Sequence, residues 1–189
     1  RASFTLAGAR RLEPRYWFIV LLGAVFTLAR FSEAFLVLRA QSVGLAIGYV
    51  PIVMIVMNVF YAAGAYPAGV AADRFGHRTL LVSGLAMLIV ADLVLAAAAT
   101  AWHVFGGALL WGLHMALTQG LLSKLVADTA PAELRGSAFG IFNLVSGVAL
   151  LAASVVAGYL WDLIGPSATF MAGAAFAAQL GTMKVTQEI

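Results

Sequence analysis

The sequence predicts an all-α membrane protein with six transmembrane helices, arranged as two inverted three-helix repeats. Three observations predict it: the composition, the number of long apolar runs and the placement of the basic residues. Of the 189 residues, 63% are hydrophobic and 10% are charged. Soluble domains are about 45–50% apolar and about 25% charged. The chain therefore has too little charge for a water-soluble surface, which excludes soluble enzymes and soluble nucleic-acid-binding domains.

Six apolar runs are long enough to cross a bilayer. A helix needs about 20 apolar residues to span a hydrocarbon core of roughly 30 Å. We expect spans at residues 16–39, 44–72, 79–100, 102–126, 136–161 and 166–183. Residues 1–15 are interpreted as a cytoplasmic linker segment. Residues 16–100 then form one three-helix unit and residues 101–189 a second of opposite topology, as in the inverted repeats of secondary transporters.

The basic residues predict the orientation. Nine of the eleven Lys and Arg residues fall on one side of the expected spans: Arg1, Arg10, Arg11, Arg15, Arg74, Arg78, Lys124, Arg135 and Lys184. By the positive-inside rule, both termini and the loops after the second and fourth spans are cytoplasmic. The net charge of +3 therefore needs no nucleic-acid partner. The composition suggests a bacterial inner membrane.

Two groups of side chains are expected at the membrane surfaces. Arg39 is expected to extend to the outer interface, since long basic side chains reach for water from apolar surroundings. Aromatic residues at the predicted ends of the spans are expected to lie among the lipid headgroups. These are Tyr16, Trp17, Trp102, Tyr159 and Trp161.

The two expected cytoplasmic loops carry spaced glycines and charges. The loop after the second span contains Gly69, Asp73, Arg74, Gly76 and Arg78, and the loop after the fourth contains Pro131, Arg135, Gly136 and Gly140. The spacing of Gly136 and Gly140 favours close approach of another helix. The first loop resembles the signature of the major facilitator superfamily, and the second is similar to a later loop of the same family. Residues 28–40 resemble the first helix of the C-terminal half in bacterial members.

The resemblance implies helices seven to twelve of a twelve-helix transporter, with a missing N-terminal half as partner. It also implies that Asp73 latches to a neighbouring helix end or basic residue in one conformation and is released when the cytoplasmic side opens. The alternative is a solvated charged turn. One departure is His77, which stands where the family commonly has a permanently charged Arg or Lys.

Polar residues inside the expected spans are candidates for the transport site, because ionisable groups in hydrocarbon are costly unless paired or hydrated. Thr27, Arg30 and Glu33 would share one face of the first helix. Further polar residues occur in the second, fourth and fifth spans: Asn58, Tyr61, Trp111, His114, Thr118, Asn143 and Ser154. These four spans are therefore expected to line a cavity, with the third and sixth as outer supports.

Several roles stay open at this stage. Arg30 and Glu33 either neutralise each other or bind an anionic solute group and a coupling proton. His114 either relays protons, since imidazole titrates near pH 6.5, or bonds to a backbone carbonyl. Trp111 and Tyr61 either stack on substrate or pack in the core. Asp92 is expected at a depth similar to that of Arg30, where the two could pair, and is interpreted mainly as a helix tether.

We therefore expect a secondary transporter that moves a small solute by alternating access and is driven by protons. Its expected partners are lipid, the solute and protons. The sequence contains no recognised enzyme, cofactor or metal motif. The alternative is a self-contained six-helix channel or an assembly subunit that acts as a homodimer.

Overall fold

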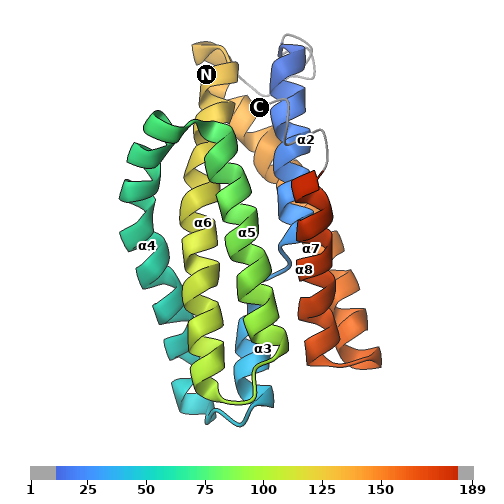
Figure 1. The fold of residues 1–189 in the computed structure, drawn as a ribbon. Coiled ribbons are helices and arrows are strands. Elements are labelled where there is room, and N and C mark those ends of the chain that lie inside the picture. The colour runs from blue at the N-terminus through green and yellow to red at the C-terminus, as the bar shows by residue number, and fades with distance from the viewer. Residues whose placement is uncertain (1–11, 183–189) are drawn as a thin grey trace.

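A computed structural model describes residues 12–182 as an upright bundle of helices (Figure 1). The elements in chain order are α2 (Pro14–Ala29), α3 (Ala34–Ser42), η1 (Ile47–Tyr49), α4 (Val50–Phe75), α5 (His77–Ala96), α6 (Ala101–Thr129), η2 (Ala132–Leu134), α7 (Arg135–Leu163) and α8 (Pro166–Thr182). Proline stands in the first turn of α2 and α4. It is tolerated there because the N–H that it lacks has no partner within the helix.

The helices follow the predicted spans in order. Five segments of the described chain are long and apolar enough to cross a membrane: Pro14–Ser42, Ile47–Phe75, His77–Ala96, Ala101–Thr129 and Ala132–Leu163. The sixth predicted span corresponds to α8, which has 17 residues. The sharp turn between α4 and α5 is made by Gly76, whose φ of 82° lies in the region that favours glycine. The fold is therefore an all-helical membrane bundle.

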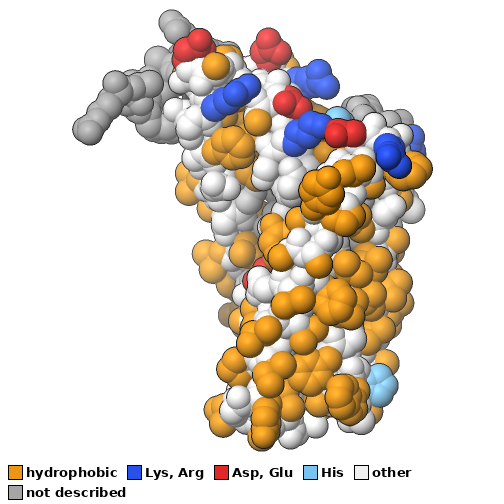
Figure 2. Space-filling model, turned by 90° about the vertical axis from the view of Figure 1, so that its left-hand side faces the viewer, with side chains coloured by type: hydrophobic (Ala, Val, Ile, Leu, Met, Phe, Trp, Pro, Cys, Tyr) orange, Lys and Arg blue, Asp and Glu red, His pale blue; other side chains and the backbone are white. Residues whose placement is uncertain are grey.

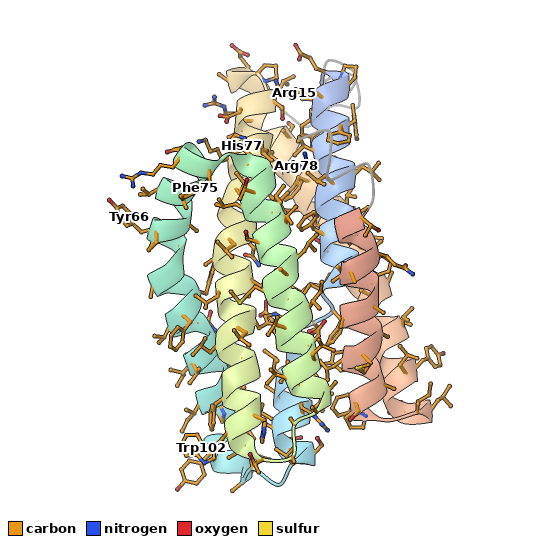
Figure 3. The ribbon with its side chains drawn as sticks, viewed as in Figure 1. Arg15, Tyr66, Phe75, His77, Arg78 and Trp102 are labelled. Atoms are coloured by element: carbon orange, nitrogen blue, oxygen red, sulfur yellow. The ribbon has the colours of Figure 1, made fainter. Side chains whose placement is uncertain are left out.

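Charged side chains gather at one end of the bundle. Figure 2 shows most of them at the top of one face, above a surface on which hydrophobic side chains predominate. Arg15, His77 and Arg78 lie at this end, and Trp102 lies at the opposite end (Figure 3). We call the charged end the polar end. The predicted basic residues Arg1, Arg10, Arg11 and Lys184 lie outside the described residues.

The centre of the bundle is α6, which packs against α4 and α5, while α5 also packs against α8 and α2 against α7. α4 and α7 keep broad apolar faces on the surface: Tyr66 is 80% exposed, Leu144 68% and Leu151 67%. Trp102 and Tyr159 are exposed, as expected of interfacial aromatics. The structure thus separates a packed centre from two helices whose outer faces have no protein partner among the described residues.

Glycine permits close helix contact, but not at the predicted positions. A Cβ added at Gly112 of α6 would collide with the backbone carbonyl of Met57 in α4, and one at Gly64 would lie 2.9 Å from the Cβ of Ala116. By contrast, nothing lies within 4 Å of a Cβ added at Gly136 or Gly140. The expectation of close approach at Gly136 and Gly140 is therefore wrong for the described residues.

The first span is broken, which corrects the expected continuous helix. α2 ends at Ala29 and α3 begins at Ala34, so that Arg30 to Glu33 lie between two helices. The N–H of Ser32 donates to Ser154 Oγ of α7 over 3.1 Å, and the N–H of Ala34 donates to Ser32 Oγ. Hydroxyl groups thus bind two of the backbone donors at the break. The single polar face predicted from Thr27 to Glu33 does not form.

Arg39 and Tyr16 are buried rather than interfacial. Arg39 is 7% exposed, and its guanidinium donates to the carbonyls of Leu95, Ala96 and Ala98 at the end of α5. Tyr16 is fully buried and donates to the carbonyl of Ala138 in α7. Both predictions are wrong because each side chain finds backbone acceptors inside the protein. Arg39 thereby joins α3 to α5, and Tyr16 joins α2 to α7.

Candidate functional site

A cluster of polar side chains lies at the break in the first span. Arg30 Nη1 is 3.4 Å from Glu33 Oε1, so the ion pair that was one of the two sequence alternatives is present. Both partners are partly buried, with 15% of the Arg30 side chain and 34% of the Glu33 side chain exposed. Gln119 of α6 and Tyr61 of α4 complete the cluster. We call these four residues the break cluster.

Gln119 connects the charged pair to Tyr61. When the Gln119 amide is turned so that its oxygen faces the guanidinium, Arg30 Nη1 donates to it over 2.6 Å. Tyr61 Oη lies 3.4 Å from the other polar atom of the amide. Sequence reasoning missed Gln119, although it follows directly on the polar stripe that ends at Thr118. The cluster thus offers a cation and a carboxylate from the break, an amide from α6 and a phenol from α4.

A groove leads from the break cluster toward the polar end. It has a volume of about 300 Å³ and lies between α4 and α6, with Leu80 of α5 in its wall. Tyr61 lines it together with Asp73 and Lys124, and most other lining residues are Ala or Gly. No atom lies within 4 Å of a Cβ added at Gly69 or Gly120. Small residues therefore keep the space open.

An ion pair joins α4 and α6 beside the groove. Lys124 Nζ donates to Asp73 Oδ1 over 2.8 Å, and both side chains are well exposed to solvent. The surrounding loop residues Arg74, Arg78, Arg135 and Gly136 are also exposed. The aspartate of the loop therefore has a basic partner on a neighbouring helix. An exposed pair contributes little to stability.

The remaining predicted site residues lie outside the hydrogen-bonded cluster. His114 is buried, and its Nδ1 lies 2.8 Å from the carbonyl oxygen of Gly84 in α5. Trp111 is fully buried, with its ring centroid 5.4 Å from that of Phe31. Asn58 is exposed and donates to Met54 of its own helix, and Asn143 is exposed on α7. His114 and Trp111 thus make the structural contacts that were among the sequence alternatives.

Asp92 does not pair with Arg30. Its side chain is fully buried, and neither carboxyl oxygen has a hydrogen-bond partner. The pairing that the sequence left open is therefore absent, and Asp92 makes no hydrogen bond among the described residues that would tether two helices. Equal depth in the membrane did not bring the two together, because Arg30 is engaged by Glu33 and lies beside Gln119.

An apolar bundle of membrane-spanning length, with a polar cluster and a groove between its helices, is the architecture of an integral membrane protein. Residues 15–184 match the Major Facilitator Superfamily. The chain belongs to this family. The sequence-based recognition is thereby confirmed.

Three relatives, from one archaeon and two bacteria, show the range of similarity. The chain is 31% identical over 182 residues to an uncharacterized MFS-type transporter of Methanocaldococcus jannaschii, an alignment that covers 93% of this chain and 46% of the relative. It is 31% identical over 104 residues to the class B tetracycline resistance protein of Escherichia coli, covering 55% of this chain and 26% of that protein. The methylenomycin A resistance protein of Bacillus subtilis is 29% identical over 112 residues, covering 59% and 24%. The chain spans about half the length or less of these relatives.

Proposed function

We propose that this chain is the C-terminal six-helix half of a proton-coupled secondary transporter that works by alternating access. Its helices would form two inverted three-helix repeats, with the polar end in the cytoplasm of a bacterium. The groove between α4 and α6 carries the proposal, because Tyr61 of the break cluster lines it together with Asp73 and Lys124. A transporter needs such a route from a polar site to one membrane surface.

The break cluster supports a coupling mechanism. Glu33 neutralises Arg30 in the present arrangement, with 3.4 Å between the groups. A proton bound by Glu33 would remove that charge and leave the guanidinium to bind a carboxylate or phosphate group of the solute, for which its planar fork is suited. Proton and solute would then bind together. Tyr61 and Gln119 would orient the solute by hydrogen bonds at the inner end of the groove.

The Asp73–Lys124 pair would act as the latch of the polar end. It bridges α4 and α6 beside the groove, so separation of these helices breaks it. Because water competes for both exposed ions, breaking the pair costs little. This suits a contact that must form and break in every cycle. Arg74, Arg78 and Arg135 would hold the loops at the cytoplasmic surface.

The exposed faces of α4 and α7 would contact lipid and an N-terminal half. Their large apolar side chains have no partner within the described residues. The share of 46% that the chain covers in the archaeal relative leaves room for a second unit of similar size. A homodimeric channel or assembly subunit is not favoured by this comparison. The intact mass of the native gene product distinguishes them: about twice the 19.8 kDa of this chain supports a two-half transporter, and about 20 kDa contradicts it.

Transport measurements test the coupling. The full-length product would be reconstituted in vesicles that contain a pH-sensitive dye. Tetracycline, taken from the name of the E. coli relative, would be the first solute, followed by a panel of organic acids. We expect Glu33→Gln to abolish transport driven by a pH gradient while solute exchange without a gradient persists.

The control is Glu133→Gln, which makes the same change at an exposed position in η2 at the polar end. It should leave transport as in the wild type. Gradient-driven transport that survives Glu33→Gln would remove Glu33 from the coupling mechanism.

A further inference from the structure

Asp92 is an exception among the buried polar side chains. Five polar or charged side chains of the described residues are buried: Arg39, Asp92, His114, Thr118 and Thr169. The other four have hydrogen-bond partners, whereas both carboxyl oxygens of Asp92 have none. An ionised carboxylate in such a place costs several kcal/mol unless water or a cation reaches it. The presence of Asp92 at this buried position is therefore not explained by a contribution to the stability of the fold.

Gly173 of α8 leaves room for the carboxyl group of Asp92. A Cβ added at Gly173 of α8 would lie 2.6 Å from Asp92 Oδ2 and 3.0 Å from Cε1 of Phe31. A carboxyl oxygen and the edge of a phenyl ring thus both lie against one glycine. Any larger residue at position 173 would displace one of them. The carboxyl group of α5 is in this way adjacent to Phe31.

Phe31 belongs to the break in the first span. Its ring packs edge-on against Phe35, Trp111 and Phe170, with centroid distances of 5.1, 5.4 and 5.3 Å. The indole Nε1 of Trp111 is also buried without a hydrogen-bond partner. Phe31 of the break thus packs against the ring of Trp111 and lies beside Gly173 together with the carboxyl group of Asp92. A rearrangement of the break that moves the Phe31 ring would change the surroundings of both Trp111 and Asp92.

Within residues 12–182, no nearby charge compensates Asp92. α8 has no charged residue, and the charges of α4 and α7 lie at the helix ends. In α6, His103, Lys124 and Asp128 lie toward the ends, and His114 bonds to Gly84. His77 and Arg78 are in the first turn of α5 itself. Arg39 is bound by carbonyls at the end of α5, and Arg30 pairs with Glu33 at the break.

We propose that Asp92 is a second proton-binding site, separate from the break cluster, and that its release of the proton is coupled to rearrangement of residues 30–33. With Phe31 packed in place, the carboxyl group keeps its proton. When the break rearranges and Phe31 moves, water reaches the group, the O–H bond breaks heterolytically and the proton passes to that water. The carboxylate that remains then favours the rearranged break. This deepens the proton coupling proposed above, but it does not depend on Glu33 or on the identity of the solute.

Hydrogen–deuterium exchange tests the proposal without any transport measurement. The exchange rates of the amides of residues 31–36 would be measured for the full-length product in lipid vesicles, from about pH 5 to about pH 9. Each rate would be divided by the intrinsic exchange rate at the same pH, which gives the protection of the amide. We expect the protection of these amides to fall about tenfold as the pH rises. This factor corresponds to a tenfold difference in the proton affinity of Asp92 between the two arrangements. In Asp92→Asn, which keeps the shape but cannot ionise, protection should not change with pH.

Two further variants separate the outcomes. Glu33→Gln should keep the tenfold fall in amide protection. If the fall is lost in Glu33→Gln but kept in Asp92→Asn, the pH response belongs to Glu33 and the proposal is overturned. If Asp92→Asn does not fold, Phe31→Leu serves, because a smaller side chain fills less of the space beside Gly173, where the carboxyl group also lies. It should move the fall to lower pH, and an unchanged curve in Phe31→Leu overturns the proposal.

Discussion

The contact between α4 and α6 can be tested with two glycines of one helix. Gly112 and Gly106 both lie in α6, but a Cβ at Gly112 would collide with the carbonyl of Met57, whereas nothing lies within 4 Å of a Cβ at Gly106. Alanine in a helix is favoured over glycine by about 0.5–1 kcal/mol. Overpacking costs about 1–3 kcal/mol, and a backbone atom cannot turn aside as a side chain does. We therefore expect Gly112→Ala to be destabilising by about 1–2 kcal/mol and Gly106→Ala to be neutral or slightly stabilising.

The two variants would be compared by unfolding in mixed detergent micelles of rising denaturing-detergent content, followed by helical circular dichroism. The free energy of unfolding relative to wild type is the measured quantity. Because both changes are Gly→Ala in the same helix, differences in propensity cancel. Equal stability of the two variants would show that α4 and α6 do not approach closely at Gly112.

Two further predictions concern the ties between helices. Arg39→Met removes the donors to three carbonyls at the end of α5 and should lower the free energy of unfolding by about 2–4 kcal/mol. The control is Arg78→Met, which makes the same change at an exposed position and should leave the free energy of unfolding unchanged. Equal unfolding curves for the two variants would contradict the role of Arg39. Reversing one charge of the Asp73–Lys124 pair should slow transport, because like charges then face each other across α4 and α6. The double reversal, Asp73→Lys with Lys124→Asp, should restore the transport rate, and a double variant no faster than the single ones would argue against the latch.

The number and order of the helices could be predicted from the sequence, and the break in the first span could not. Length and hydropathy suffice for spans because every backbone donor and acceptor must be satisfied in lipid. The break contains neither proline nor glycine, so the local signals for a helix end are absent. It depends instead on Ser154, which lies 122 residues away in sequence.

Hydropathy also did not predict the surroundings of individual side chains. A hydropathy value does not distinguish contact with lipid from contact with protein, so Tyr16 and Arg39 were assigned to the membrane surface although both are buried. The same limit applies to glycine. The spacing of Gly136 and Gly140 suggested a contact that is not present, while Gly112 and Gly173 pack closely against α4 and Asp92. Such contacts depend on which distant helix lies opposite, and one sequence does not contain that information.

The break in the first span has a mechanical consequence. Tyr16 binds α2 to α7, and Arg39 binds α3 to α5, so the two parts of the span are tied to different helices. Between them, residues 30–33 are already outside any helix, and a change of angle there need not rupture an α-helical hydrogen-bond ladder. We therefore expect any change of angle between the two parts of the span to occur at this break. The charged residues of the break cluster are located at its pivot, where a small rotation changes the distance between groups carried by different helices.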